Sequence, residues 1–108
     1  MNLKIEQIER LNRLIRECKK FSGSRLPKGH ALYSFCSTYD DRFIYAAAEL
    51  WQIYRDAGIA LPEKQMSKDF IENGVVNSSN TIMTVTNVKY LYNTHLKSVV
   101  MANLKTTC

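Results

Sequence analysis

Three kinds of side chain in this sequence are able to do chemistry: two adjacent carboxylates, two histidines and three cysteines. Asp40 and Asp41 come directly before an apolar segment of helical period, where the capping of a helix N-terminus accounts for them. His30 and His95 have no carboxylate or cysteine beside them, so no acid–base pair is visible in the sequence, although one could assemble in space. The cysteines are too scattered for a disulfide scaffold or a zinc site: Cys18, Cys36 and Cys108. We therefore expect no enzymatic activity, no cofactor and no bound metal.

The second chemical signal is positive charge, because 15 Lys and Arg stand against 10 Asp and Glu, a net charge of +5. The excess is concentrated between Lys4 and Lys28, and a cationic surface of this kind suits a polyanion such as nucleic acid. Some of these cations recur at helical spacing, and others lie in a loop punctuated by Gly23, Pro27 and Gly29, whose backbone can approach a phosphate. An ordinary solvated face remains the alternative. The predicted phosphate contacts are Arg13, Arg16, Lys19, Lys20, Arg25 and Lys28.

A second candidate for DNA contact lies in residues 66–92, which we interpret as a helix-turn-helix around Gly74. Small polar residues open the second helix of this unit, where hydroxyls and backbone N–H groups suit phosphate oxygens. The gap after Gly74 is longer than the usual turn and few cations lie nearby, so a plain helical corner is the alternative. The predicted contacts are Ser78, Ser79 and Thr81.

Helical periodicity dominates the rest of the chain, and it predicts one all-α domain, residues 1–108, of four to five helices. Apolar positions three and four apart predict a first helix that Gly23 stops, and Gly58 supplies the end of the second. The predicted helices are 3–21, 40–57, 62–73 and 79–104, with a strand at 79–88 as the alternative. The predicted core is Phe43, Ile44, Leu50, Trp51, Ile53 and Tyr54.

No apolar run approaches the roughly 20 residues of a membrane helix, and the N-terminus lacks the apolar block of a signal peptide. The lack of these segments favours a protein that does not enter a membrane. The three scattered cysteines, which form no visible pairs, favour a cytoplasmic location.

The run from Arg13 to Ser24, followed by Pro27-Lys28-Gly29, resembles the bacterial flagellar transcriptional activator family FlhC. The likeness continues more weakly through the Ala48–Trp51 helix to Cys108. It implies a transcriptional activator that binds promoter DNA, in the family usually with the partner subunit FlhD, and FlhC-like regulators also occur on conjugative elements. On matching positions it implies DNA contact by Arg25, Lys28 and the face from Arg13 to Lys20. The family's zinc-binding C-terminal part has no counterpart here, so zinc dependence is not carried over.

Our leading hypothesis is therefore a DNA-binding transcriptional regulator, an FlhC-like activator whose basic helix and loop contact phosphates. The alternative is a small protein-binding adaptor or inhibitor encoded by a mobile element, acting through an aromatic and methionine-rich helical face. The amphipathic terminal helices favour a homodimer in either case, and an FlhD-like subunit is the other expected partner besides double-stranded DNA. The proposed adaptor face comprises Met83, Tyr90, Tyr92 and Met101.

Overall fold

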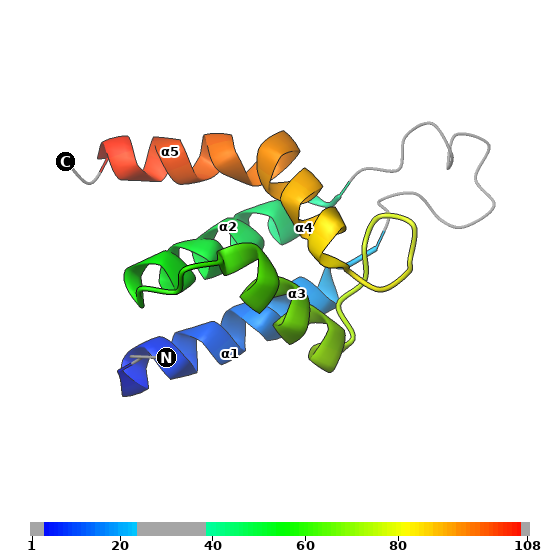
Figure 1. Cartoon of the computed structure of the whole chain (residues 1–108), viewed down its shortest axis with the longest axis horizontal. Coiled ribbons are helices and arrows are strands. Elements are labelled where there is room, and N and C mark those ends of the chain that lie inside the picture. The colour runs from blue at the N-terminus through cyan, green and yellow to red at the C-terminus, as the bar shows by residue number, and fades with distance from the viewer. Residues whose placement is uncertain (1–3, 24–38, 107–108) are drawn as a thin grey trace.

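The computed structural model describes residues 4–23 and 39–106, with only the backbone for residues 103–106. The helices are α1 (Ile5–Lys20), α2 (Asp41–Asp56), α3 (Pro62–Asn73), α4 (Val85–Leu91), the π-helical turn η1 (Tyr92–Leu96) and α5 (Lys97–Thr106). Because α4, η1 and α5 follow one another without a break, they form one continuous bent helix, and the described residues contain four helices in all (Figure 1). The described residues contain no strand. The predicted all-α single domain of four to five helices is confirmed.

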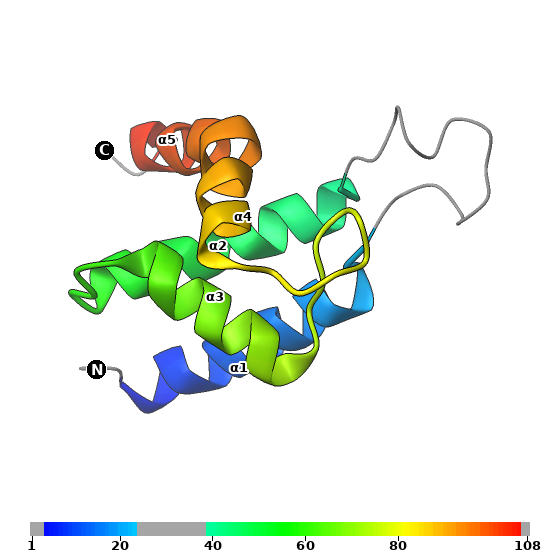
Figure 2. The same cartoon turned by 45° about the vertical axis from the view of Figure 1, so that its right-hand side comes forward.

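Helix α2 is the centre of the molecule, lying between α1 and α5 with α3 packed across α1 and α2 (Figures 1 and 2). The Asp40 carboxylate caps α2 by accepting the Arg42 backbone N–H at 2.8 Å, and Gly58 follows its end at φ +77°. Both features were predicted from the sequence. The predicted core residues are buried except Ile44, which is half-buried at the edge of the core.

Helix α1 packs on α2 through a stripe of residues spaced three and four apart, which confirms the predicted helical period. The buried stripe begins only at Leu11. The apolar residues Ile5 and Ile8, near the start of the predicted helix, are exposed. The Arg10 guanidinium contacts the Glu49 carboxylate of α2 at 3.2 Å, an ion pair between the two helices. The buried residues of α1 are Leu11, Leu14, Ile15 and Cys18.

The prediction of one helix over residues 79–104 is wrong at its start. Residues 77–81 form a turn, Val76 and Ile82 form an isolated antiparallel bridge, and the helix begins only at Val85, capped by the Thr84 hydroxyl. The cause is Asn77, whose side chain binds the turn's own backbone in place of a helical pattern. The strand alternative over 79–88 is also wrong beyond that single bridge.

The rod from α4 to α5 changes direction at η1 (Figures 1 and 2). A π-helical turn inserts an extra residue into the helical ladder, and such insertions bend helices. Tyr92 in this turn stacks on Trp51 with ring centroids 4.1 Å apart, while Leu96 and Val100 are fully buried. The bend therefore allows α4 to pack on α3 and α5 to pack on α2.

Candidate nucleic-acid interface

Three of the predicted phosphate contacts, Arg13, Arg16 and Lys20, lie on the side of α1 opposite its buried stripe, which we call the outer face of α1. Their spacing of three and four residues places them on neighbouring turns. All three are exposed, and within residues 4–23 and 39–106 none of them takes part in an ion pair. Glu6, Glu9 and Glu17 are the acids on this side. From residue 13 to the end of α1, Arg13, Arg16 and Lys20 stand against Glu17 alone, so this half of the face presents more positive than negative charge to solvent.

Lys19 points elsewhere, toward the C-terminus of α3. Its Cε lies 3.7 Å from the position that a Cβ on Gly74 would occupy. The last turn of α3 contains no basic residue of its own, so the Lys19 ammonium supplies the positive charge that favours a helix C-terminus. Lys19 therefore contacts α3 from α1. The carbonyl end of α3 competes with an external anion for its ammonium group.

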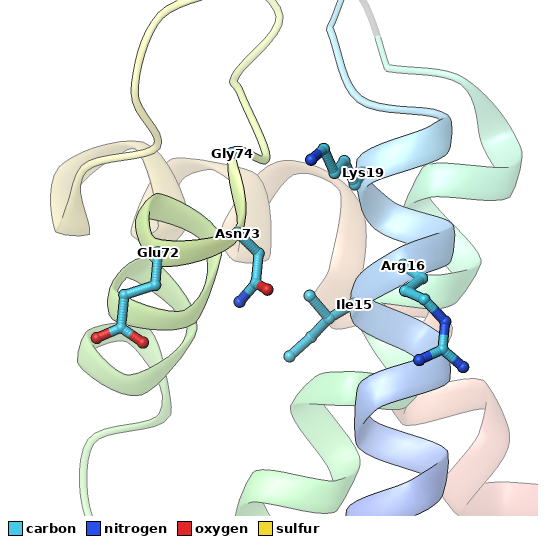
Figure 3. Close-up of a pocket in the computed structure, with 6 residues that line it drawn as sticks. All are labelled: Ile15, Arg16, Lys19, Glu72, Asn73 and Gly74. Atoms are coloured by element: carbon cyan, nitrogen blue, oxygen red, sulfur yellow. The ribbon is translucent and has the colours of Figure 1, made fainter.

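A cavity of about 400 Å³ opens beside Lys19, between α1 and the last turn of α3 (Figure 3). Arg16 and Lys19 come from the α1 side, and Glu72 and Asn73 from the α3 side, with the Glu72 carboxylate directed away from α1 (Figure 3). Because both signs of charge and the carbonyl end of α3 meet here, the cavity is a poorer place for an anion than the outer face of α1.

Part of the second predicted contact region, residues 77–82 within 66–92, meets the end of α1. A Cβ built on Gly23 would lie 2.5 Å from Oδ1 of Asn80 and 3.9 Å from a methyl group of Val76, so the two segments touch. The prediction that Ser78, Ser79 and Thr81 open a helix is wrong, because these residues belong to the turn before the bridge. The structure nevertheless brings the turn and the basic end of α1 to one end of the molecule (Figures 1 and 2).

Within this turn the three predicted residues differ in their surroundings. Ser78 is half-buried beside Tyr39, whereas Ser79 and Thr81 are exposed. The Thr81 hydroxyl accepts a hydrogen bond from the Asn77 side chain at 2.8 Å. Two further predicted contacts, Arg25 and Lys28, lie outside the described residues.

Arg42, at the start of α2, is a cation at the same end that the sequence analysis missed. Its guanidinium carbon lies 4.1 Å from the centroid of the Phe21 ring, and Nζ of Lys20 lies 5.4 Å from the same centroid. The Asp40 carboxylate accepts two hydrogen bonds from the Arg42 guanidinium, at 2.8 and 3.0 Å, and this raises the pKa of Arg42. The Phe21 ring therefore contacts two cations, Lys20 and Arg42. The Asp40 carboxylate neutralises the charge of Arg42. The signal for this arrangement was the Asp-x-Arg spacing at the predicted helix cap.

A second missed signal is the distribution of acids. The last carboxylate side chain of the sequence is Glu72, so residues 73–108 contain lysines and a histidine but no Asp or Glu. This stretch includes the 77–81 turn, α4, η1 and α5. Its exposed polar residues are mainly hydroxyl and amide side chains. A phosphate backbone that approaches this side of the molecule therefore meets no carboxylate from these elements.

The histidine and cysteine that were considered for chemistry, His95 and Cys18, pack against other residues of the fold. His95 packs edge-on against Tyr39 with ring centroids 5.8 Å apart. Cys18 is fully buried, and burial raises the pKa of its thiol. The Tyr54 hydroxyl donates to the Asp69 carboxylate, which also accepts from Gln65 at 3.1 Å. In the described part of the chain, no three His, Cys, Asp or Glu side chains are grouped closely enough to hold a metal ion. The expectation that the protein is not an enzyme stays a prediction.

None of the helices described here has both the length and the apolar character that a membrane span requires. Comparisons with protein-family models, with curated proteins and with solved structures found no match for this chain. The resemblance to FlhC therefore stays a prediction that rests on the residues of the sequence alone.

Proposed function

We propose that this protein is a DNA-binding transcriptional regulator, of FlhC-like character, whose basic first helix binds the phosphate backbone of duplex DNA. The observation that carries the proposal is the outer face of α1, where exposed cations take part in no ion pair among the described residues. The end of α1 also lies against Asn80, in a segment without Asp or Glu. When Lys and Arg side chains contact phosphates, counterions leave the DNA, and their release favours binding.

The dimensions of α1 suit this role. Arg13 and Lys20 are separated by seven residues of helix, a rise of about 10 Å at ~1.5 Å per residue. One DNA strand advances ~3.4 Å of helix axis per phosphate, so the outer face of α1 spans about three phosphates. Arg25 and Lys28, if they act as predicted, would extend the contact beyond the helix.

A salt-titrated mobility shift on random duplex DNA tests the proposal. The variant Arg13→Ala/Arg16→Ala/Lys20→Ala should bind more weakly to every duplex, and the slope of log K against log salt should flatten by about 0.9 for each phosphate that the variant no longer neutralises. These side chains are exposed, so the free energy of unfolding should change by no more than about 0.5 kcal/mol. The same titration on Arg25→Ala and Lys28→Ala variants extends the test to the contacts outside the described residues.

A matched control removes the same charge from other exposed positions, in the variant Arg55→Ala/Lys64→Ala/Lys68→Ala. If the outer face of α1 is the binding surface, this control should retain a salt slope close to that of the original protein. Equal losses in the two triple variants would assign binding to net charge alone. Undetectable duplex binding by the original protein at ~50 mM salt, where phosphate contacts are strong, would refute the proposal.

The adaptor alternative receives less support from the arrangement of its own residues. Met83 is fully buried, and Tyr92 stacks on Trp51, so neither lies on an open helical face. Tyr90 and Met101 remain exposed, at 67% and 47%. The predicted aromatic and methionine surface is therefore reduced to two separate side chains, and we do not propose it as a second function. A homodimer and an FlhD-like partner stay predictions.

A further inference from the structure

The segment Asn77–Ile82, which we call the 77–82 loop, is held in shape by one buried amide. Asn77 is 7% exposed, and its Oδ1 accepts the backbone N–H of Ser79 at 2.9 Å and of Thr81 at 3.1 Å. Its Nδ2 donates to the Thr81 hydroxyl at 2.8 Å and to Oδ1 of Asn87 at 3.1 Å. The loop therefore keeps its shape without a bound partner, which lowers the conformational cost of binding one.

The loop presents an uncharged surface with one prominent apolar group. Ile82 is 60% exposed although its neighbour Met83 is fully buried, because successive residues of an extended segment point to opposite sides. Ser79 and Thr81 are exposed beside it. The loop itself contains no Asp, Glu, Lys or Arg. Such a surface is too weakly charged to attract DNA alone, but it carries the hydroxyl and methyl groups that discriminate between base edges.

The position of the loop places this surface beside the cations. The Asn80 side chain lies against Gly23, three residues after the end of α1, and Lys19 lies against Gly74, three residues before the loop begins. The end of α1 and the loop therefore lie side by side in both views (Figures 1 and 2). A duplex held by the outer face of α1 would have the 77–82 loop next to one of its grooves.

We propose that the 77–82 loop enters the major groove and reads base sequence while the outer face of α1 holds the phosphates. This inference rests on the proposed function. The major groove, about 12 Å wide, admits a two-stranded ribbon, and the Val76–Ile82 bridge makes the base of the loop a ribbon of minimal length. The Ser79 hydroxyl can hydrogen-bond to a base edge, and Ile82 can contact the methyl group of thymine. Affinity then comes from α1 and sequence preference from the loop.

Selection from a random duplex library, followed by sequencing of the bound fraction, separates the two roles. The original protein should enrich a short motif. The variant Ser79→Ala/Ile82→Ala should lose that motif, with preference falling roughly tenfold or more for each base contact removed, while its salt slope on random duplex stays unchanged. Arg13→Ala/Arg16→Ala/Lys20→Ala should show the opposite result, with weaker binding and a flatter salt slope but the same motif.

The matched control is Leu61→Ala/Ser98→Ala, which removes an exposed aliphatic side chain before α3 and an exposed hydroxyl on α5. It should retain the motif, and thermal unfolding should show that all three variants fold. If the loop variant enriches the original motif at the original strength, the inference is wrong although the proposed function stands. The inference is equally wrong if the original protein binds duplex DNA but enriches no motif. If it binds no duplex DNA at all, both proposals fail.

Discussion

The outer face of α1 and the 77–82 loop lie at the same end of the molecule but are built in opposite ways. The cations of α1 extend into solvent, and no ion pair among the described residues restrains Arg13, Arg16 or Lys20. The loop has no formal charge, and the buried side chain of Asn77 fixes its backbone at several points. Charge and shape are therefore supplied by different segments.

This division has a consequence for folding. Exposed Lys and Arg side chains contribute little to the free energy of unfolding, because water solvates them almost as well in either state. A buried amide that satisfies several backbone groups contributes more, because its removal leaves those groups unpaired. Substitution of Asn77 should therefore affect stability, whereas substitution of the α1 cations should affect anion binding.

The largest expected effect is that of Asn77→Ala. The change leaves the N–H groups of Ser79 and Thr81 without their acceptor and removes the donor to Asn87. We expect the free energy of unfolding to fall by about 2–4 kcal/mol. Urea denaturation followed by circular dichroism measures the loss.

Asn73→Ala provides the comparison for Asn77→Ala. Asn73 is exposed, and its side chain donates to the Asp69 carbonyl at 2.7 Å. This bond lies on the surface of α3, so its loss should cost about 1 kcal/mol or less. If the two asparagine variants lose the same stability, then the loop is not organised by its buried amide.

The contrast between the two segments also explains how much the sequence could predict. The outer face of α1 follows from local rules, because a regular stripe of apolar residues determines which side of the helix faces solvent. The cap at Asp40 and the end at Gly58 follow from equally local rules. The cap and the helix end were predicted, and the structure agrees. The cationic face of α1 was predicted to include Lys19, which the structure instead directs toward α3.

The loop was not predicted, because its shape depends on contacts that composition does not reveal. Ile82, Val85 and Val88 keep a helical rhythm, so the pattern favoured one helix through residues 79–88. Asn77 overrides that rhythm by binding Thr81 and Asn87, which lie four and ten residues away. The contact between Asn80 and Gly23 joins segments still farther apart in sequence.

That contact leads to the second prediction, for Gly23→Ala. Gly23 has φ +91°, and an added Cβ would lie 2.5 Å from Oδ1 of Asn80. The variant should suffer both backbone strain and a steric clash, at a total cost of about 2 kcal/mol in the free energy of unfolding. Gly58→Ala is the matched control, because Gly58 also has a positive φ of +77° but no atom lies within 4 Å of its Cβ position.

The Gly58 variant should therefore suffer only the strain, about 1 kcal/mol. Combining Gly23→Ala with Asn80→Gly should recover the part of the loss that is due to the clash, since glycine also tolerates the positive φ of residue 80. Equal costs for the two single variants, with no recovery in the double variant, would show that the end of α1 and the loop are not in contact.

Alkaline pH should destabilise both regions through buried ionisable groups, and within the first pH unit above their ordinary pKa values this is the smallest effect. Burial raises the pKa of Cys18, on the buried side of α1, above its ordinary value of 9.0, and that of Tyr39, beside the loop residue Ser78, above 10.0. The folded protein then retains protons that the unfolded chain releases, so stability is complete below those ordinary values and falls as pH rises above them. The loss for each group is at most about 1.4 kcal/mol per pH unit.

Urea midpoints measured between about pH 8 and 11 give the slope, and two variants measure the shares of Cys18 and Tyr39. Tyr54, whose pKa is also raised by burial and by its hydrogen bond to Asp69, contributes to the slope above pH 10 in both variants. Cys18→Ala should flatten the decline that begins near pH 9, whereas Tyr39→Phe should change the curve only above pH 10, where the unfolded tyrosine ionises. The Tyr39 contribution should be smaller, because Ser78 partly offsets the effect of burial on its pKa. If Tyr39→Phe leaves the whole curve unchanged, the loop does not cover a buried phenol.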